Sequence, residues 1–447
     1  MNPKIFRAYD IRGIYPEDLN EEAAYNIGAA FALFIKKTSG KENPQIVVGR
    51  DNRKSSDSLF KELKKGIIEQ GADVIDIGLS ATPTLYFAAA EYDYDGGINV
   101  TASHNPKQYN GFKMVRDNAI TLSEESGIEE IKEMALAGEF IKAEKEGKVT
   151  EKKVSEEYVC SNSVSDKFSL KIVVDTANSV SGVLVPKIFK NINLVHMLGE
   201  LDGDFPTHQP DPTKKENIKF LQDRVIEEKA DLGIAFDGDG DRVSFIDEKG
   251  EVVSSDLILT LVSSIILRDL PGSKVLYDIR SSNIIREAVE ALGGEAVPSR
   301  IGHSFIKETM RDKDITLGAE YTGHYYLKHE GNYFESPYFF IFSVLREMER
   351  TKKRLSQLVE PFRVYFHSGE INFEVETREE IEETIERVKE KYKAGELSYV
   401  DGLRADFEDW WFSLRASNTE PVLRLVVEAK SEELMKEKVE EIKGLIY

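Results

Sequence analysis

The apolar residues of the chain fall in short continuous runs, and three of these runs open in the same way. Segments 45–53, 171–179 and 274–282 each lead from a basic or amide residue through a short apolar stretch into a polar loop. The β-branched residues at 46–48 and 172–174 favour strands over buried helices. This weak internal repeat predicts three α/β units in series.

Amphipathic stretches follow the three runs. Residues 56–69, 181–189 and 283–292 have helical periodicity, and another apolar run comes after each. Strands that alternate with helices in this way are typical of a parallel sheet covered by helices on both faces. We therefore predict an α/β fold for most of the chain.

The last part of the chain has another pattern. Residues 371–375 alternate as in a half-exposed strand, 378–392 form a charged amphipathic helix, and strands at 410–414 and 422–428 precede a closing helix at 431–446. We expect a smaller α+β domain here.

The length of the chain requires more than one hydrophobic core. A single core seldom exceeds about 250–300 residues, and the chain has 447. Glycine and charged residues interrupt the apolar pattern near 147–151, 248–251 and 366–369. The expected domains are 1–149, 150–250 and 251–366, all α/β, and 367–447, which is α+β.

The composition excludes several classes of protein. Lys and Arg number 59 against 80 Asp and Glu, so the formal net charge is −21, and the basic residues do not form blocks. Because nucleic-acid binding depends on basic residues that neutralise phosphates, we expect no nucleic-acid partner. A content of 41% hydrophobic and 31% charged residues is typical of a folded globular chain.

The sequence also argues against a membrane or secreted protein. The longest apolar stretches, 257–267 and 338–345, are shorter than the roughly 18 residues that cross a bilayer. The N-terminus lacks a secretory apolar region, and the single cysteine, Cys160, cannot form an internal disulfide. We expect a cytoplasmic protein with no membrane partner, present as a monomer or a homodimer.

Three aspartates at alternate positions follow the apolar run 232–236. Asp237, Asp239 and Asp241 are separated by glycines, which let the backbone curl so that the carboxylates converge on one hard divalent cation. An octahedral ion held in this way keeps positions open for phosphate or water. The pattern predicts a Mg²⁺-binding loop, with an acidic surface turn as the alternative.

A calcium-binding EF-hand is a second alternative, because Glu248 stands at the twelfth position of such a loop. However, Arg242 stands at the sixth position, where the EF-hand requires glycine, and the flanking residues are typical of strands. The EF-hand is therefore disfavoured.

A second polar segment, 99–106, places Ser103 beside His104 and an Asn-Pro turn. A hydroxyl that follows a strand and is flanked by an imidazole can act as a nucleophile or carry a phosphoryl group. Taken alone, a turn or helix-capping serine beside a solvated histidine is the simpler interpretation.

Two further loops have side chains suited to a sugar phosphate. The loop 318–324 offers a carboxylate, a hydroxyl and an imidazole, which suit sugar hydroxyls. The loop 415–421 combines a guanidinium, two hydroxyls and an amide, a donor set suited to phosphate oxygens. Each loop, considered singly, is explained as well by an ordinary surface connection.

The four loops together, one in each expected domain and in this order, resemble the α-D-phosphohexomutase superfamily, most closely its phosphomannomutase/phosphoglucomutase branch. The resemblance spans essentially the whole chain. It implies three related α/β domains with mixed sheets and a smaller α+β C-terminal domain around a central cleft. It also implies an isomerase that interconverts hexose 1-phosphates and hexose 6-phosphates of mannose or glucose, through a phosphoserine and a bisphosphorylated sugar.

The resemblance assigns roles residue by residue. Ser103 is similar to the phosphorylated serine of the family, and it would complete a Mg²⁺ site with Asp237, Asp239 and Asp241. The residues expected at the reacting phosphoryl group are Arg12, His104, Lys113, Arg242 and His324, of which Lys113 and His324 are the candidate proton-transfer groups. The residues expected to contact the sugar phosphate are Tyr9, His303, Glu320, Thr322, His324, Arg415, Ser417, Asn418 and Thr419.

The expected cofactors are one Mg²⁺ per chain and a hexose 1,6-bisphosphate as activator and intermediate, and the expected partners are small sugar phosphates. Thr322 stands where the family usually has serine and Ala319 where glycine is common, so the preferred sugar stays open. The alternatives are a phosphoglucosamine mutase, a metal-dependent phosphatase or phosphotransferase, and a catalytically silent protein that binds sugar phosphates or Ca²⁺.

Overall fold

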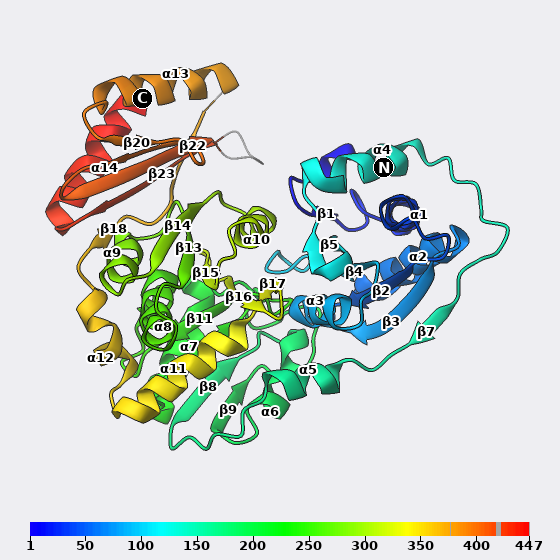
Figure 1. Ribbon diagram of the computed structural model, residues 1–447, viewed down its shortest axis with the longest axis horizontal. Helices are drawn as coiled ribbons and strands as arrows, with labels where there is room; N and C mark the ends of the chain where they lie inside the picture. The colour runs from blue at the N-terminus through cyan, green and yellow to red at the C-terminus, as the bar shows by residue number, and fades with distance from the viewer. Residues whose placement is uncertain (376, 417–421, 447) are drawn as a thin grey trace. The chain divides into compact units, whose positions relative to one another are not determined.

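A computed structural model describes residues 1–375, 377–416 and 422–446, and Figure 1 labels its helices and strands. The chain divides into two compact units, each built from two chain segments. Unit 1 contains Met1–Ser254 and Thr322–Ser356, and unit 2 contains Ser255–Tyr321 and Gln357–Tyr447.

The first sheet of unit 1 is mixed. Its strands are β1 (Ile11–Ile14), β2 (Gln45–Arg50), β3 (Asp73–Leu79), β4 (Gly96–Val100), β5 (Tyr109–Arg116), β6 (Ile120–Thr121) and β7 (Val149–Glu151). β2 pairs in parallel with β3 and β4, and β3 pairs in parallel with β7. β5 is antiparallel to β1, β4 and β6.

Helices cover both faces of this sheet. α1 (Glu21–Ser39) and α2 (Ser56–Glu69) lie side by side on one face, and α3 (Thr82–Glu91) lies on the other (Figure 1). α1 and α2 approach closely at two glycines. A Cβ on Gly66 would lie 2.2 Å from the carbonyl oxygen of Tyr25, and one on Gly28 would lie 2.3 Å from that of Leu63. α4 (Glu129–Ala137) also packs against α1.

The second sheet of unit 1 is also mixed. Its elements are β8 (Lys171–Asp175), β9 (Asn193–Met197), β10 (Leu232–Phe236), β11 (Val243–Ile246) and β12 (Val252–Val253), with the helices α5 (Ser155–Asn162), α6 (Val185–Ile188) and α7 (Lys215–Glu228). β8 pairs in parallel with β9 and β10, and β11 is antiparallel to β10 and β12.

The predicted helix over 181–189 is wrong in extent. A 3₁₀ helix covers Val180–Val183, and α6 occupies only Val185–Ile188. Pro186 has no backbone N–H and is tolerated only in the first turn of an α-helix, so a new helix begins there.

The second chain segment of unit 1 contains β16 (Tyr325–His329), β17 (Asn332–Glu335) and α11 (Pro337–Thr351). β16 and β17 form an antiparallel hairpin. The ring of Tyr338, at the start of α11, lies 6.0 Å from that of Phe189 and 5.5 Å from that of Phe236, measured between centroids. These aromatic contacts join the second segment of unit 1 to the first.

Unit 2 begins with a third set of strands and helices. β13 (Lys274–Asp278) pairs in parallel with β14 (Glu295–Ser299) and β15 (Leu317–Ala319). The helices are α8 (Ser255–Asp269), α9 (Asn283–Ala291) and α10 (His303–Asp312), and α12 (Leu355–Val359) follows α11 in the chain. β2, β8 and β13 confirm the three strands predicted from the repeated apolar runs.

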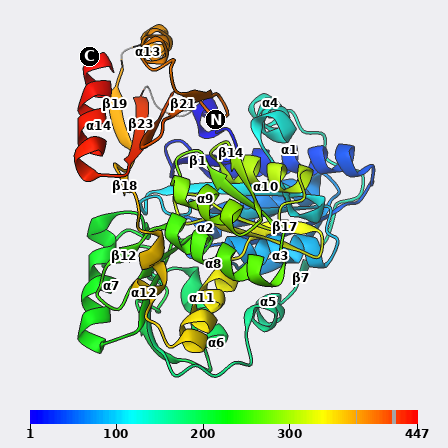
Figure 2. The same ribbon diagram turned by 60° about the vertical axis from the view of Figure 1, so that its left-hand side comes forward.

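The C-terminal sheet is antiparallel, and two helices pack on it (Figure 2). Its elements are β18 (Phe366–His367), β19 (Ile371–Glu374), β20 (Glu396–Ser398), β21 (Leu403–Asp406), β22 (Trp410–Ala416), β23 (Val422–Ala429), α13 (Arg378–Lys391) and α14 (Glu432–Ile446). The sequence predicted β19, β22, β23 and both helices. It missed β18, β20 and β21, which are too short for an alternating pattern to be recognised.

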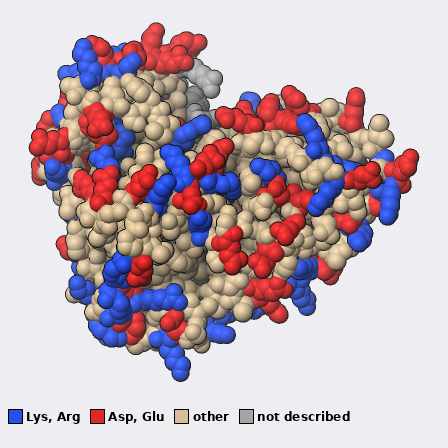
Figure 3. Space-filling view, viewed as in Figure 1, with Lys and Arg blue, Asp and Glu red and all other residues tan. Residues whose placement is uncertain are grey.

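Two further features concern the helices and the surface. Among the described helices, none is long and apolar enough to span a membrane. On the face in Figure 3, Lys and Arg side chains are interspersed with Asp and Glu. The two kinds of charge are therefore mixed on this face.

Candidate active site

Two adjacent parallel strands bring two loops to one edge of the first sheet. The serine loop, which contains Ser103, joins β4 to β5, and a second loop, which contains Arg53, joins β2 to α2. β2 and β4 pair with Arg50 opposite Val100, so the residues that follow these strands leave the sheet together. Ligands of α/β proteins bind outside the carboxyl ends of such strands. The segments that contain Arg53 and Ser103 therefore start side by side.

Ser103 is held in an unusual conformation. Only 1% of its surface is exposed, and its φ is 50°, a left-handed value that costs a residue with a Cβ on the order of 1–3 kcal/mol. Its amide donates to Thr101 Oγ1 (2.9 Å), and its hydroxyl donates to Asp237 Oδ2 (2.7 Å). The hydroxyl also lies 3.3 Å from Nδ1 of His104. Ser103 is thus directed at the aspartate loop and not at solvent.

The aspartate loop joins β10 to β11, so strands flank it as the sequence predicted. Asp237, Asp239 and Asp241 each place one oxygen within 4.8 Å of the others, and at most 1% of each residue is exposed. Three buried carboxylates so close together repel one another unless cations compensate them.

Two glycines allow the aspartate loop to curl against the serine loop. Gly240 has a φ of 74°, which an L side chain rarely adopts. A Cβ on Gly238 would lie 2.2 Å from the carbonyl oxygen of Ser103. The two loops therefore meet backbone to backbone.

The cluster fits a divalent cation. Oδ1 of Asp239 is buried and has no hydrogen-bond partner in the part of the chain that the structure describes. Its Oδ2 accepts hydrogen bonds from Thr82 Oγ1 (2.6 Å) and Lys113 Nζ (2.7 Å). A buried carboxylate oxygen without a partner is costly, and carboxylate oxygens are the ligands that Mg²⁺ prefers.

Lys113, on β5, lies inside this cluster. Its ammonium contacts the carboxylates of Asp239 and Asp241. Burial by itself lowers the pKa of Lys113, but Asp239, Asp241 and Asp237 outweigh burial and raise this pKa above its ordinary value. Lys113 is therefore a cation here, which favours an electrostatic role over that of a base.

The aspartates of the loop differ in their pKa values. Burial, together with the charges of Asp239 and Asp241, raises the pKa of Asp237 well above its ordinary value. Burial acts in the same direction on Asp241, but Lys113 and His324 hold the pKa of Asp241 well below its ordinary value. A further positive charge is therefore needed more for the ionisation of Asp237 than for that of Asp241.

Two histidines and an arginine complete the cluster in unit 1. Nε2 of His324 lies 3.1 Å from Asp241 Oδ1, and Arg242 Nε lies 3.0 Å from the same nitrogen. Burial, and then the charge of Arg242, lowers the pKa of His104 well below its ordinary value. The imidazole of His104 is therefore neutral at pH 7.

Arg12, on the edge strand β1, also contacts the serine loop. Its guanidinium donates to the side-chain oxygen of Asn105 and to Asp10 Oδ2 (2.5 Å). Tyr9, three positions before Arg12, is half-buried, and so is Thr322, two positions before His324. The structure thus places Arg12, Lys113, Arg242 and both histidines around the two loops.

Unit 2 contains most of the residues expected to recognise the sugar. Glu320 and His303 are both buried there. Oε1 of Glu320 accepts a hydrogen bond from the amide of Gly302 (2.9 Å), which directly precedes His303 at the start of α10. Glu320 and His303 therefore lie near each other within this unit, although 17 positions separate them in the sequence.

Three arginines of unit 2 lie close to the carboxylate of Glu370. Its carboxylate lies 2.9 Å from Arg415 NH2, 3.2 Å from Arg424 NH1 and 3.7 Å from Arg280 NH1. Burial raises the pKa of Glu370, but the three guanidinium groups outweigh it and lower this pKa. Such a concentration of guanidinium groups can hold an anion such as a phosphate monoester. The other residues expected in this phosphate loop, Ser417, Asn418 and Thr419, lie outside the described residues.

The sequence interpretation missed two arginines that repeat one local structure. Arg53 donates from its amide and Nε to the carboxylate of Asp51, and Arg280 donates in the same way to Asp278. Both pairs follow the first strand of an α/β unit, β2 and β13. The recurrence of Asp-x-Arg at equivalent places of the repeat is the signal that could have revealed them.

Comparison with known proteins gives matches along nearly the whole chain. Four models of the phosphoglucomutase/phosphomannomutase family match: alpha/beta/alpha domain I at residues 3–142, domain II at 152–250, domain III at 254–365 and the C-terminal domain at 370–445. These matches confirm the predicted fold class of three α/β domains and a C-terminal domain.

Individual relatives agree. A phosphomannomutase of Methanocaldococcus jannaschii is 41% identical over 99% of this chain and 97% of its own length. A phosphoglucomutase of Neisseria gonorrhoeae is 34% identical over 96% of this chain and 93% of its own. The crystal structure of a phosphoglucomutase/phosphomannomutase family protein from Burkholderia thailandensis superposes with a TM-score of 0.91 at 30% identity, covering 100% of this chain and 97% of that one.

Proposed function

The chain belongs to the phosphoglucomutase/phosphomannomutase family and is a phosphohexomutase, and we propose that Ser103 carries the phosphoryl group that it transfers. The observation that supports this role is the position of the Ser103 hydroxyl, which donates at 2.7 Å to one of three clustered aspartates. The substrates are the 1- and 6-phosphates of mannose and glucose, because relatives that cover nearly the whole chain bear both names.

The reaction has two phosphoryl transfers. In the first, the bond between Ser103 Oγ and phosphorus breaks and a bond from phosphorus to the free hydroxyl oxygen of the hexose phosphate forms. The proton of that hydroxyl passes to a base, and Ser103 Oγ takes up a proton. The product is a hexose 1,6-bisphosphate. In the second, Ser103 Oγ attacks the other phosphoryl group and its proton passes to a base. The bond between that phosphorus and the sugar oxygen breaks, the sugar oxygen takes up a proton, and the isomeric hexose phosphate is released.

Asp237, Asp239 and Asp241 would hold a Mg²⁺ ion, for which their buried oxygen donors are suited. When bound, the ion supplies positive charge that stabilises the transferring phosphoryl group. Phosphoryl transfer depends mainly on such charge and on in-line positioning, and Arg12 and Arg242 add to the charge from the protein.

The proton acceptors differ between the two transfers. When Ser103 attacks, its proton can pass to the neutral imidazole of His104, whose Nδ1 lies 3.3 Å from Ser103 Oγ. His324 is the candidate base for the sugar hydroxyl. Lys113, whose pKa is raised, stays positively charged and is suited to stabilise negative charge.

Recognition of the sugar phosphate is the proposed task of the remaining residues. Glu320, with His303 nearby, would accept hydrogen bonds from sugar hydroxyls, and Thr322 would add a hydroxyl contact. Arg415, with Arg280 and Arg424 close to the same carboxylate, would bind the phosphate that does not react. A phosphate site separate from the serine is needed because the substrate must turn over between the two transfers.

Intact-mass spectrometry tests the role of Ser103. The purified protein is measured before and after incubation with glucose 1,6-bisphosphate and Mg²⁺, and the modified peptide is mapped. We expect one phosphoryl group at Ser103, and none in the Ser103→Ala variant. Absence of phosphate from Ser103 under both conditions would remove the serine from the mechanism.

The alternatives are separated by two further measurements. Rapid release of inorganic phosphate from the phosphorylated protein would favour a phosphatase. The values of kcat/KM for glucosamine 6-phosphate, mannose 6-phosphate and glucose 6-phosphate determine the preferred sugar, and a preference for the first would indicate a phosphoglucosamine mutase.

A further inference from the structure

Arg53 is a buried residue whose guanidinium binds the backbone of the serine loop. Only 2% of its surface is exposed. Its NH2 group donates to the carbonyl oxygens of Ser103 (2.7 Å) and Asn105 (2.7 Å). Its NH1 group donates to those of Pro106 (2.8 Å) and Tyr109 (3.2 Å). One buried side chain therefore binds four carbonyls of the loop 103–109.

The remaining donor of Arg53 fixes the guanidinium itself. Nε donates to Asp51 Oδ2 (3.1 Å), so all five N–H groups of the side chain have acceptors. The other oxygen of Asp51 accepts hydrogen bonds from the amide of Arg53 (2.9 Å) and from Ser56 Oγ (2.5 Å) at the start of α2. The ring of Phe205 lies 5.1 Å from the guanidinium carbon. Hydrogen bonds to Asp51 and to the serine loop, together with the ring of Phe205, therefore fix the position of the Arg53 guanidinium.

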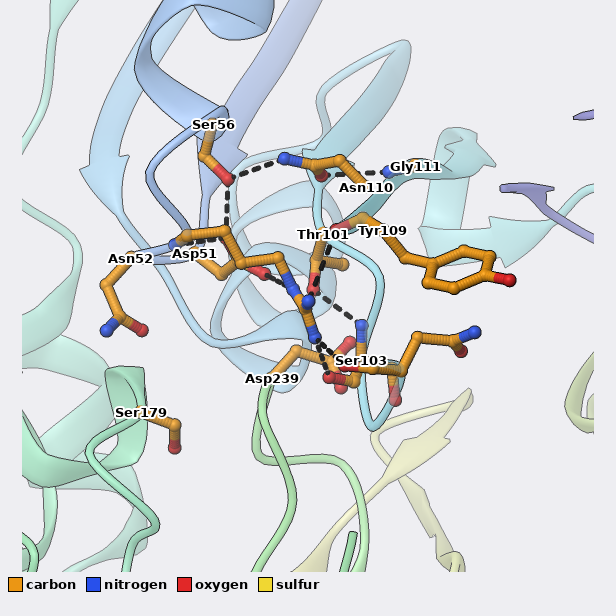
Figure 4. Close-up of polar contacts among 12 residues, drawn as sticks. Asp51, Asn52, Ser56, Thr101, Ser103, Tyr109, Asn110, Gly111, Ser179 and Asp239 are labelled. Atoms are coloured by element: carbon orange, nitrogen blue, oxygen red, sulfur yellow. Dashed lines mark hydrogen bonds and ion pairs between the residues drawn. The ribbon is translucent and has the colours of Figure 1, made fainter. Parts of the chain in front are cut away.

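The network reaches the next strand as well. The side-chain amide of Asn110, on β5, donates to Ser55 Oγ (2.8 Å) and Ser56 Oγ (3.0 Å), and Figure 4 shows Asn110, Ser56 and Asp51 in one chain of contacts. β5 continues directly from the serine loop. The loop is therefore tied to the start of α2 both at its centre, by Arg53, and at its end, by Asn110.

We propose that Arg53 is the positioning residue for phosphoryl transfer: it imposes the left-handed conformation of Ser103 and so directs the serine oxygen at the aspartate cluster. A serine rarely adopts φ near 50° by its own preference, so the surroundings must impose it. The carbonyl of Ser103 is the group that Arg53 grips, and this carbonyl determines the orientation of the peptide that follows the serine. The inference rests on the proposed role of Ser103.

The fork of the guanidinium is essential to this task. Its planar N–H groups point in fixed directions and can bind two pairs of carbonyls at once. A lysine keeps the positive charge but has one donor nitrogen with three N–H groups, so at least two of the five acceptors would lose their partners. We therefore expect Arg53→Lys to disturb the serine loop although the positive charge is kept.

The test measures transfer of the phosphoryl group from glucose 1,6-bisphosphate to dephosphorylated Ser103 in a single turnover. We expect the rate to fall about 100-fold in Arg53→Lys, the effect of displacing a reacting group by about 1 Å. The KM for glucose 1-phosphate should stay within threefold of wild type, because Arg53 touches no group that we assign to substrate binding. Added guanidinium ion should restore part of the rate in Arg53→Ala, where it can occupy the space left by the side chain.

Arg50→Lys is the matched control. Arg50 lies three positions earlier, is half-buried, and pairs with Asp57 through NH2 (2.6 Å). Its NH1 donates to the backbone carbonyl of Asp51 (3.2 Å) and not to the carboxylate that holds Arg53, and no hydrogen bond of its side chain reaches the loop 103–109 among the described residues. We expect its transfer rate to stay within twofold of wild type. A transfer rate of Arg53→Lys close to that of Arg50→Lys would overturn the inference, and so would a change confined to KM.

A second variant covers the case in which the Arg53 variants do not fold. Asp51→Asn keeps the size of the side chain but removes the charge that fixes Nε of Arg53, and it should slow the transfer in the same assay without changing KM. An unchanged rate in a folded Asp51→Asn protein would also refute the inference. If wild-type Ser103 accepts no phosphoryl group, the proposed function fails; if it accepts one and the variants match it, only the role of Arg53 fails.

Discussion

Gly238→Ala is the sharpest test of the contact between the serine loop and the aspartate loop. The added Cβ would lie 2.2 Å from the carbonyl oxygen of Ser103 and 3.2 Å from Cγ of Pro210. Unlike Gly240, Gly238 has no positive φ, so alanine meets no backbone strain there. The effect of the substitution is therefore the steric contact alone.

The structure sets the size of the displacement. Real Cβ atoms essentially never come closer than 3.0 Å to another heavy atom, so the Ser103 carbonyl must move by about 1 Å. That movement stretches the hydrogen bond from Arg53, which is 2.7 Å long in the native protein. We expect kcat to fall about 100-fold, as for other displacements of this size, and the unfolding free energy to fall by about 1–3 kcal/mol.

The assay follows conversion of glucose 1-phosphate to glucose 6-phosphate by coupling the product to NADP⁺ reduction, and urea unfolding gives the stability. Gly444→Ala is the control, because a Cβ on Gly444, in α14, meets nothing within 4 Å. A Gly238→Ala protein with kcat within threefold of the Gly444→Ala protein would refute the argument that the two loops must touch.

Three further predictions concern the metal, the phosphate and a buried acid. Asp239→Asn should raise the Mg²⁺ concentration that gives half-maximal activity by about tenfold or more, because the oxygen without a protein partner loses its charge, and a chelator should abolish turnover of the wild type. Arg415→Ala should raise the KM for glucose 1-phosphate by about 10- to 100-fold, with a smaller change in kcat, since a charged hydrogen bond to phosphate is lost. Burial, and then Glu428, raises the pKa of Asp256 to about 7. Between about pH 4 and pH 7 the unfolded chain therefore loses this proton while the folded protein keeps it, so the unfolding free energy falls as the pH rises. Between pH 5 and pH 7 the wild type should therefore lose about 1–3 kcal/mol more unfolding free energy than Asp256→Asn, as measured by urea unfolding.

The elements that follow local rules could be predicted from the sequence. The runs at 45–53, 171–179 and 274–282 gave β2, β8 and β13, and the amphipathic stretch 56–69 gave α2 with both ends correct. The aspartate loop was also visible, because alternating aspartates and glycines after an apolar run have a direct chemical meaning. These features depend on residues that are close together in the chain.

The remaining features depend on residues far apart in the chain, and no local pattern contains them. Arg53 reaches Ser103 across 50 positions, and His324 reaches Asp241 across 83. Neither contact changes the periodicity of the segments that make it. Their roles became visible only through the parallel pairing of β2 with β4 and the return of the chain to unit 1.

Because a chain is synthesised from its N-terminus, the two segments of unit 1 leave the ribosome at different times. A ribosome adds roughly 5–20 residues per second, so His324 emerges about 4–17 s after Asp241, which it contacts from 83 positions away. During that interval the aspartate loop can contact Lys113 but not His324. A fragment that stops at Ser254 lacks the same partner and the whole of Thr322–Ser356. Truncation there is therefore a poor way to isolate unit 1, because that unit needs both of its chain segments.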